Sequence, residues 1–114
     1  MKSHLHLTPR QEALAERNVC VALAALTTPE EIRAFLRDLC TPAELQAMAD
    51  RWAVVDYLKR KLSYREIYRL TGVSVTTIGR VARFLSQGHG GYSTASARLE
   101  ERRGAPRALH PLPN

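Results

Sequence analysis

The motif Thr-Pro-x-Glu/Gln occurs three times in the first half of the chain, at residues 8–11, 28–31 and 41–44. In each copy the threonine hydroxyl can accept a backbone N–H of a helix, and the Glu or Gln side chain can reach back to the cap. The proline fits the first helical position because no N–H is needed there. Residues 63–66, Ser-Tyr-Arg-Glu, repeat the pattern without the proline. Four helix starts of one kind predict an all-α chain.

Apolar residues at helical spacing extend these starts into helices. The predicted helices cover residues 9–26, 29–39, 42–62, 64–70, 75–85 and 93–101. Residues 19–26, in the second half of the first helix, are apolar on every side, and such a helix must be buried all round. A chain of 114 residues forms one domain with a modest core. We therefore expect a second copy of the chain to cover this helix.

Charge is unevenly distributed along the chain. Residues 1–50 hold 5 Lys/Arg and 7 Asp/Glu, whereas residues 51–114 hold 12 Lys/Arg and 4 Asp/Glu. This asymmetry is typical of one half that packs and one half that faces a polyanion such as nucleic acid. A basic but merely solvated surface is the alternative.

Several classes of protein are disfavoured by the sequence. It has no run of about 18 apolar residues, which argues against a membrane span. The N-terminus lacks the apolar stretch of a signal peptide, so we expect a cytoplasmic protein. Cys20 and Cys40 make neither a disulfide framework nor a zinc site, and no metal site is expected. Because no Ser/His/Asp or Cys/His set has a catalytic spacing, we expect no enzyme and no required cofactor.

Residues 64–85 have the layout of a DNA-binding helix-turn-helix, with a short helix, a tight turn and a second helix. Gly72 supplies the left-handed backbone of the turn, and Ser74 caps the second helix. The core between the two helices is expected to consist of Ile67, Val73, Ile78 and Val81.

The second helix leaves an outer face of short and basic side chains, and its N-terminal part would enter the major groove of DNA. This outer face consists of Val75, Thr76, Gly79, Arg80 and Arg83. The turn, the apolar spacing and the surrounding arginines favour a DNA-reading head. The alternative is a helical protein-interaction or dimerisation module without specific DNA binding.

From Phe35 to Tyr92 the chain resembles the Trp repressor family of transcriptional regulators, the group that includes TrpR, YerC and YecD. The residues that carry the resemblance are 35–41, 44–52, 64–67, 71–74, 77–81 and 88–92. The resemblance implies an intertwined helical homodimer built from residues 1–92, with the helix-turn-helix at about residues 64–85. Two such heads would read a double-stranded, pseudo-palindromic DNA operator.

The resemblance also implies DNA contacts for Arg65 on the first helix of the motif and for four residues on the second. With Ser74 at the cap and Arg83 on the outer face, the predicted DNA-binding residues are Arg65, Ser74, Val75, Thr76, Gly79, Arg80 and Arg83. The expected function is a sequence-specific transcriptional regulator, a repressor. Residues 93–114 are expected to form a short helix, a disordered basic tail, or both.

L-tryptophan is a candidate corepressor, and another small molecule is the alternative. Four residues match positions that hold tryptophan in the responsive members of the family: Thr41, Arg51, Thr77 and Arg80. Phe84 and Val81 depart from the pattern, because they stand where a Ser and a Gly leave room for the ligand.

Overall fold

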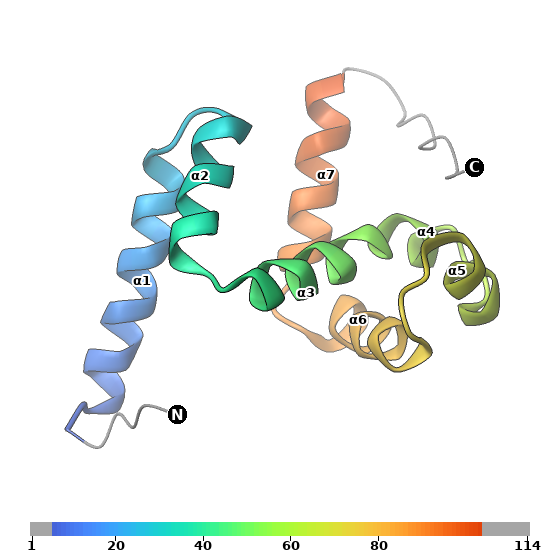
Figure 1. The fold of residues 1–114 in the computed structure, drawn as a ribbon, viewed down its shortest axis with the longest axis horizontal. Coiled ribbons are helices and arrows are strands. Elements are labelled where there is room, and N and C mark those ends of the chain that lie inside the picture. Colours follow the sequence, from blue (N-terminus) through green and yellow to red (C-terminus); the bar gives the residue numbers. More distant parts are fainter. Residues whose placement is uncertain (1–5, 104–114) are drawn as a thin grey trace. The chain divides into compact units, whose positions relative to one another are not determined.

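The computed structural model describes residues 6–103 and is entirely helical in that range (Figure 1). Its elements in chain order are α1 (Pro9–Ala25), α2 (Pro29–Leu39), α3 (Pro42–Ala53), α4 (Val55–Lys59), α5 (Tyr64–Thr71), α6 (Val75–Gln87) and α7 (Gly91–Arg103). The chain divides into two compact units, residues 1–42 and residues 43–114. Across residues 6–103, none of these helices has the length and apolar character needed to cross a membrane.

Unit 1, described over residues 6–42, begins both of its helices with threonine caps. Thr8 and Gln11 form the predicted capping box, with the Thr8 hydroxyl and the Gln11 side chain each accepting a backbone N–H of the other residue. Thr28 accepts the N–H of Glu31, but the Glu31 carboxylate accepts the N–H of Thr27 instead of closing the box on Thr28. The predicted starts of α1 and α2 are therefore confirmed.

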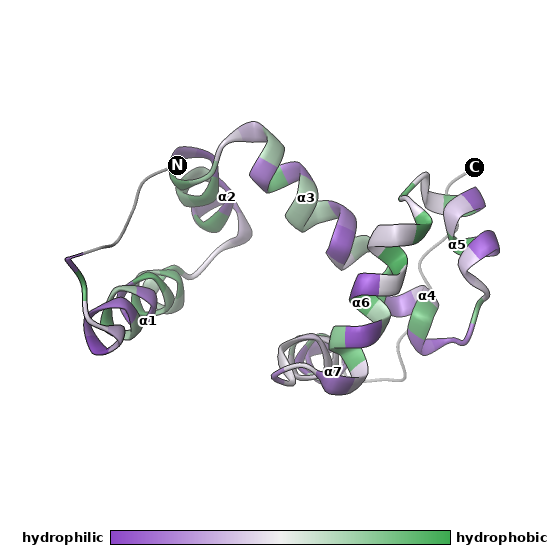
Figure 2. Ribbon diagram, turned by 90° about the horizontal axis from the view of Figure 1, so that it is seen from below, coloured by the Kyte–Doolittle hydropathy of each residue, from purple (hydrophilic) through white to green (hydrophobic). Residues whose placement is uncertain are grey.

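No residue of α1 or α2 is buried in the single chain. Hydrophobic residues are spread along both helices among hydrophilic ones (Figure 2). Leu14 and Val21 are both more than half exposed, at 56% and 53%. Unit 1 thus has helical structure without a core of its own.

The single helix predicted over residues 42–62 is wrong in two respects, because it is divided into α3 and α4 at Val54 and because α4 ends at Lys59. Val54 has φ −95° and ψ −6°, at the margin of the helical region. Val54 and Val55 are both fully buried. Neighbouring residues of a straight helix point about 100° apart, so the break allows two adjacent valines to face one core.

The end of α4 is a Schellman motif with a lysine at its left-handed position. Leu62 donates its N–H to the Tyr57 carbonyl over 3.2 Å, and Lys61 donates to Leu58 over 3.0 Å. Lys61 has φ 67°, a conformation that glycine usually supplies at this place. Leu62 and Tyr57 both belong to the hydrophobic cluster of unit 2, so tertiary packing holds the strained turn.

The core of the described chain lies in unit 2. Its buried hydrophobic residues are Val54, Val55, Tyr57, Ile67, Val73, Ile78 and Val81. Partly buried residues of α4, the α4–α5 connection, α5, α6 and α7 pack against it: Leu58, Leu62, Leu70, Leu85 and Tyr92. The four residues predicted as the helix-turn-helix core are among the buried ones, which confirms that prediction.

The last described helix, α7, is longer than the predicted helix over 93–101. It includes Arg102 and Arg103, which the sequence placed in the tail. Two contacts attach it to unit 2: Tyr92 stacks on Trp52 with ring centroids 6.3 Å apart, and the buried Ser96 hydroxyl accepts from Lys59 Nζ over 2.7 Å. The rest of the predicted tail, residues 104–114, lies outside the described residues.

Candidate nucleic-acid interface

The helix-turn-helix is built by α5, the turn at residues 72–74, and α6. Ser63 caps α5 by accepting the N–H of Glu66 over 3.1 Å. Gly72 has φ 76° and donates its N–H to the Tyr68 carbonyl over 2.8 Å, which confirms the predicted left-handed turn. Ser74 caps α6 by accepting the N–H of Thr77 over 3.1 Å, as predicted.

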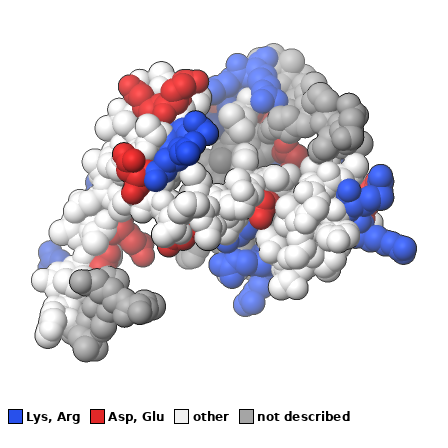
Figure 3. All heavy atoms as spheres, in the orientation of Figure 1, with Lys and Arg blue, Asp and Glu red and all other residues white. Residues whose placement is uncertain are grey.

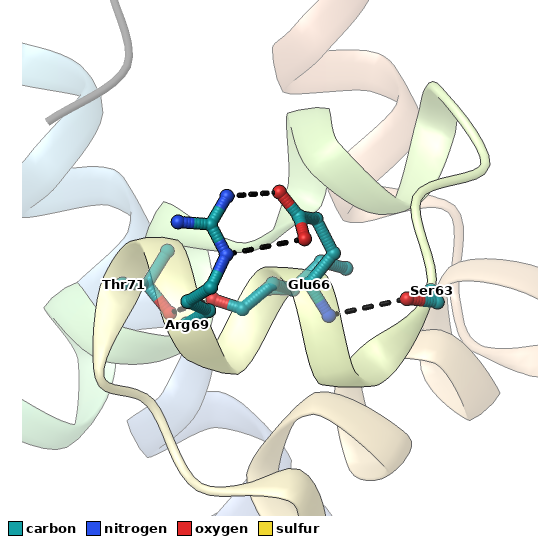
Figure 4. A network of polar contacts seen from close by, with 5 residues as sticks. Ser63, Glu66, Arg69 and Thr71 are labelled. Atoms are coloured by element: carbon teal, nitrogen blue, oxygen red, sulfur yellow. Dashed lines mark hydrogen bonds and ion pairs between the residues drawn. The ribbon is translucent and has the colours of Figure 1, made fainter.

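Thr71 ties the end of α5 to the turn. Its hydroxyl donates to the Ile67 carbonyl over 2.7 Å and accepts the N–H of Val73 over 3.1 Å. Figure 4 shows Thr71 on α5 beside the polar network of that helix. Ile67 and Val73 are also buried core residues, so the same short segment anchors both the polar turn and the apolar contact between the helices.

The predicted outer face of α6 is accessible in the single chain. Val75, Thr76, Arg80 and Arg83 are exposed, whereas Gly79 is half-buried. Ile78 and Val81, on the opposite side of the helix, are fully buried. Helix α6 contains no acidic residue. Its N-terminus and outer face therefore carry positive charge, together with short side chains and the backbone of Gly79, which has no side chain of its own. These are properties that suit a helix approaching base edges and phosphates.

Helix α5 carries two exposed arginines, Arg65 and Arg69, and Arg69 forms an ion pair. Glu66 and Arg69 form a bidentate ion pair, with Arg69 Nε donating to Glu66 Oε1 over 3.2 Å and Arg69 Nη2 donating to Oε2 (Figure 4). Hydrogen bonding to Arg69 lowers the pKa of Glu66, and the same pairing raises the pKa of Arg69. Arg65 is exposed, and blue Lys and Arg side chains are visible over α5 at the right-hand edge of unit 2 (Figure 3).

Tyr64 adjoins the outer face of α6, and the sequence reasoning missed it. A Cβ placed on Gly79 would lie 3.8 Å from the Tyr64 ring atom Cε2. Tyr64 is 41% exposed. The cap at Ser63 makes Tyr64 the first residue of α5, but nothing in the sequence indicates that its ring lies beside a residue 15 positions later.

A basic run, Lys59-Arg60-Lys61, precedes the helix-turn-helix, and its three side chains lie in different surroundings. Lys59 bonds Ser96, and Lys61 is exposed in its left-handed turn. Arg60 is half-buried with its guanidinium 4.9 Å from the centre of the Tyr57 ring. Arg60 Nε and Nη2 are buried without a hydrogen-bond partner among the described residues.

The predicted corepressor residues are distributed over both units. Thr41 belongs to unit 1, and Arg51, Thr77 and Arg80 belong to unit 2. Thr77 accepts a hydrogen bond from the Ser74 hydroxyl over 3.0 Å, and Arg51 is half-buried. The described residues of unit 2 therefore bring Thr77 and Arg80 onto one helix, α6.

Of the two residues that depart from the tryptophan-binding pattern, Phe84 lies next to Arg80 and Val81 lies in the core. The Arg80 guanidinium lies 5.0 Å from the centre of the Phe84 ring, and the Arg83 guanidinium lies 5.7 Å from it. Both distances are typical of cation–π contacts. Val81 is fully buried in the core.

Between residues 6 and 103, no group of three or more His, Cys, Asp or Glu side chains is placed to hold a metal ion. In the described part of the chain, neither Cys20 nor Cys40 forms a disulfide. The residues that the structure does gather are hydroxyl, basic and apolar side chains around α5 and α6.

Comparisons with known proteins agree with this arrangement. The family model described as Trp repressor protein matches residues 16–100. The chain is 38% identical over 80 residues to the uncharacterized protein YerC of Bacillus subtilis (strain 168), and the match covers 70% of this chain and 77% of that protein.

Two solved structures also resemble it. A proposed Trp repressor from Staphylococcus aureus has a TM-score of 0.71 and 32% identity, covering 76% of this chain and 87% of that chain. A TrpR-like protein from Eubacterium eligens ATCC 27750 has a TM-score of 0.69 and 32% identity, covering 83% of this chain and 94% of that chain. On the family match, the shared sequence and the shared helical fold, this chain belongs to the Trp repressor family.

Proposed function

We propose that this chain is a sequence-specific DNA-binding transcriptional regulator, acting as a repressor. The observation that carries the proposal is the exposed outer face of α6, which lacks acidic residues and is held on a packed helix-turn-helix in a member of the Trp repressor family. Arg65 from α5 and Arg80 from α6 are the candidate base-reading side chains, since a bidentate arginine contact to guanine supplies about 1–3 kcal/mol of discrimination.

The regulator would work as a homodimer. Support comes from unit 1, whose two helices bury no residue in the single chain and expose Leu14 and Val21. A second copy of the chain supplies apolar surface of the required kind, because a symmetric dimer pairs identical patches. Two copies carry two α6 helices, which matches a pseudo-palindromic operator.

Selection of bound duplexes from a random DNA pool tests the function directly. The expected result is a recurring pseudo-palindromic site, with binding that weakens steeply between about 50 and 200 mM salt because phosphate contacts release counterions. Arg65→Ala is expected to reduce the ratio of specific to non-specific affinity. The matched control is Arg33→Ala, on an exposed position of α2 in unit 1, which is expected to leave that ratio unchanged.

The same measurement distinguishes the alternative function. A dimer that binds no duplex at about 50 mM salt, where electrostatic binding is strong, would indicate a helical interaction module without specific DNA binding. Weak binding of equal strength to every sequence would contradict the regulator proposal as well.

No cofactor is required in this proposal, and L-tryptophan is a candidate corepressor to be tested. The Phe84 ring beneath Arg80 favours a protein that binds DNA without it. A ligand that binds the native state must raise the melting temperature. We expect no shift with millimolar L-tryptophan for the wild type, and Phe84→Ser provides the matched variant with more space beside Arg80. A clear shift of the wild type, together with tighter operator binding, would instead establish tryptophan as the corepressor.

A further inference from the structure

The contact between Tyr64 and Gly79 joins two helices at the edge of the proposed reading surface. Tyr64 is the first residue of α5, and its ring atom Cε2 lies 3.8 Å from the position of a Cβ on Gly79. Gly79 lies on the outer face of α6, between the exposed Val75 and Arg83. The aromatic ring therefore borders the part of α6 that has no side chain.

The backbones of α5 and α6 are both held in place next to this ring. The start of α5 is set by the Ser63 cap, and α5 is attached to unit 2 through the fully buried Ile67. On α6, Ile78 is fully buried and directly precedes Gly79 in the chain. Tyr64 as a whole is nevertheless 41% exposed, so the residue keeps surface that a ligand can reach.

Position 79 has no side chain next to the Tyr64 ring, although glycine is unfavourable inside a helix. Glycine inside a helix is less favourable than alanine because it loses more backbone freedom. A Cβ at position 79 would make only an ordinary van der Waals contact with Tyr64. We expect the added methyl groups of a branched side chain to crowd the ring. Gly79 thus leaves the middle of the outer face open, and Tyr64 is the side chain at its border.

We infer that Tyr64 is a specificity-determining residue that contacts a base edge in the operator next to the Gly79 backbone. Its ring offers an apolar edge for a thymine methyl group, and its phenol O–H offers a hydrogen bond to a base acceptor. This inference rests on the proposed DNA-binding function. It adds a base contact from α5 to the contacts proposed for residues 75–83 of α6.

The test compares base preferences of the full chain carrying Tyr64→Ala or Tyr64→Phe. Tyr68 provides the matched control, because it lies one turn further along α5 and is 53% exposed. We expect Tyr64→Ala to change the preference at one or two base pairs of each half-site by about tenfold, within the range of one lost base contact. Tyr68→Ala is expected to leave the pattern of preferences unchanged.

Tyr64→Phe distinguishes the two parts of the contact, since it keeps the ring and removes the hydroxyl. A change at the same base pairs identifies a hydrogen bond to a base, and retention of the wild-type pattern identifies the ring as the reader. In contrast, a loss of affinity that is equal for all sequences in Tyr64→Ala identifies a phosphate contact and overturns the inference. An unchanged pattern in Tyr64→Ala overturns it too.

Two substitutions at Gly79, to valine and to alanine, test the same contact independently. The valine is expected to displace the ring and to alter the preference at the same base pairs as Tyr64→Ala. In the double variant Tyr64→Ala/Gly79→Val, the fold-change in those preferences should be smaller than the product of the fold-changes of the two single variants. The alanine should keep the wild-type pattern. Thermal unfolding confirms that each variant is folded. If the wild type selects no site at all, the proposed function fails; if it selects a site that Tyr64 does not influence, only this inference fails.

Discussion

Unit 1 and unit 2 are both helical, but they differ in what their helices bury. The described part of unit 1 contains two well-capped helices and not one buried side chain. Unit 2 contains the seven buried hydrophobic residues of the described chain, grouped around α4, α5 and α6. Caps and helix propensity therefore define the helices of unit 1, whereas tertiary packing stabilises those of unit 2.

This difference teaches that helix formation and stability are separable in this chain. Isolated helices of 11 and 17 residues, as in unit 1, gain little from capping alone. Apolar burial is the main source of stability, and the apolar side chains of unit 1 are at most half-buried in a single copy. A second copy of the chain that covers these side chains would give unit 1 buried residues as well.

The largest expected effect comes from placing a charge on unit 1. Val21→Asp would bury an unpaired carboxylate at the proposed dimer contact, and such burial costs several kcal/mol. We expect the dimer to dissociate into monomers at micromolar concentration, measured by sedimentation, with a loss of helical circular dichroism. Asn18→Asp, on the more polar half of α1, is the matched control. A dimer that persists in Val21→Asp would show that unit 1 is not the contact.

The core of unit 2 should respond strongly to truncation even in a single chain. Ile78→Ala removes a fully buried side chain and is expected to lower the free energy of unfolding by about 2–5 kcal/mol. Ile32→Ala in unit 1 is the comparison, and both changes are made in the Val21→Asp background so that only monomers are measured. Urea unfolding should show a much smaller effect for Ile32. Equal losses would contradict the assignment of the core to unit 2.

A gain in stability is expected within unit 2 at the end of α4. Lys61 holds φ 67°, which costs a non-glycine residue roughly 1–2 kcal/mol. Lys61→Gly should relieve this strain and, after the entropy of glycine in the unfolded chain is subtracted, raise the free energy of unfolding by about 1 kcal/mol. Lys61→Ala removes the same charge without relieving the strain, so it should show no gain in the same urea measurement.

The smallest expected effect is the pH dependence of two glutamates, one in each unit. Hydrogen bonds lower the pKa of Glu66 through Arg69 and that of Glu31 through Thr27, from the ordinary value of 4.5. A lowered pKa in the folded state stabilises the fold above pH 4.5, and this contribution disappears as the pH falls through the lower value.

Melting curves of Glu66→Gln and Glu31→Gln against wild type should therefore differ most near neutral pH and converge in acid. Both side chains are on the surface, where solvent screens such interactions, so only small shifts of the melting temperature are expected. A difference in melting temperature between variant and wild type that grows as the pH falls would contradict this prediction.

Local interactions explain which features were predictable from the sequence. The cap at Thr8, the left-handed Gly72 and the Ser74 cap depend on residues within four positions of each other, and all three were predicted. Ile67, Val73, Ile78 and Val81 were recognised as a core because their spacing follows the helix period.

The missed features depend on packing between distant residues. The break at Val54 follows from two valines that face one core, and the strained Lys61 is held because Leu62 and Tyr57 pack there. The ring of Tyr64 beside Gly79 is a contact between two helices. Charge counts also gave no indication that Arg69 is neutralised by Glu66 or that Arg60 is half-buried.

The break at Val54 also separates two stretches of helix that we expect to exchange their amide protons at different rates. Helix α3 ends before it without one buried residue, whereas α4 begins after it with Val55 and Tyr57 in the core. Amide protons exchange with solvent when their helix opens locally, and opening is easiest where few apolar contacts must be broken. A stretch that reads as one helix in the sequence would therefore exchange its first half early and its second half late.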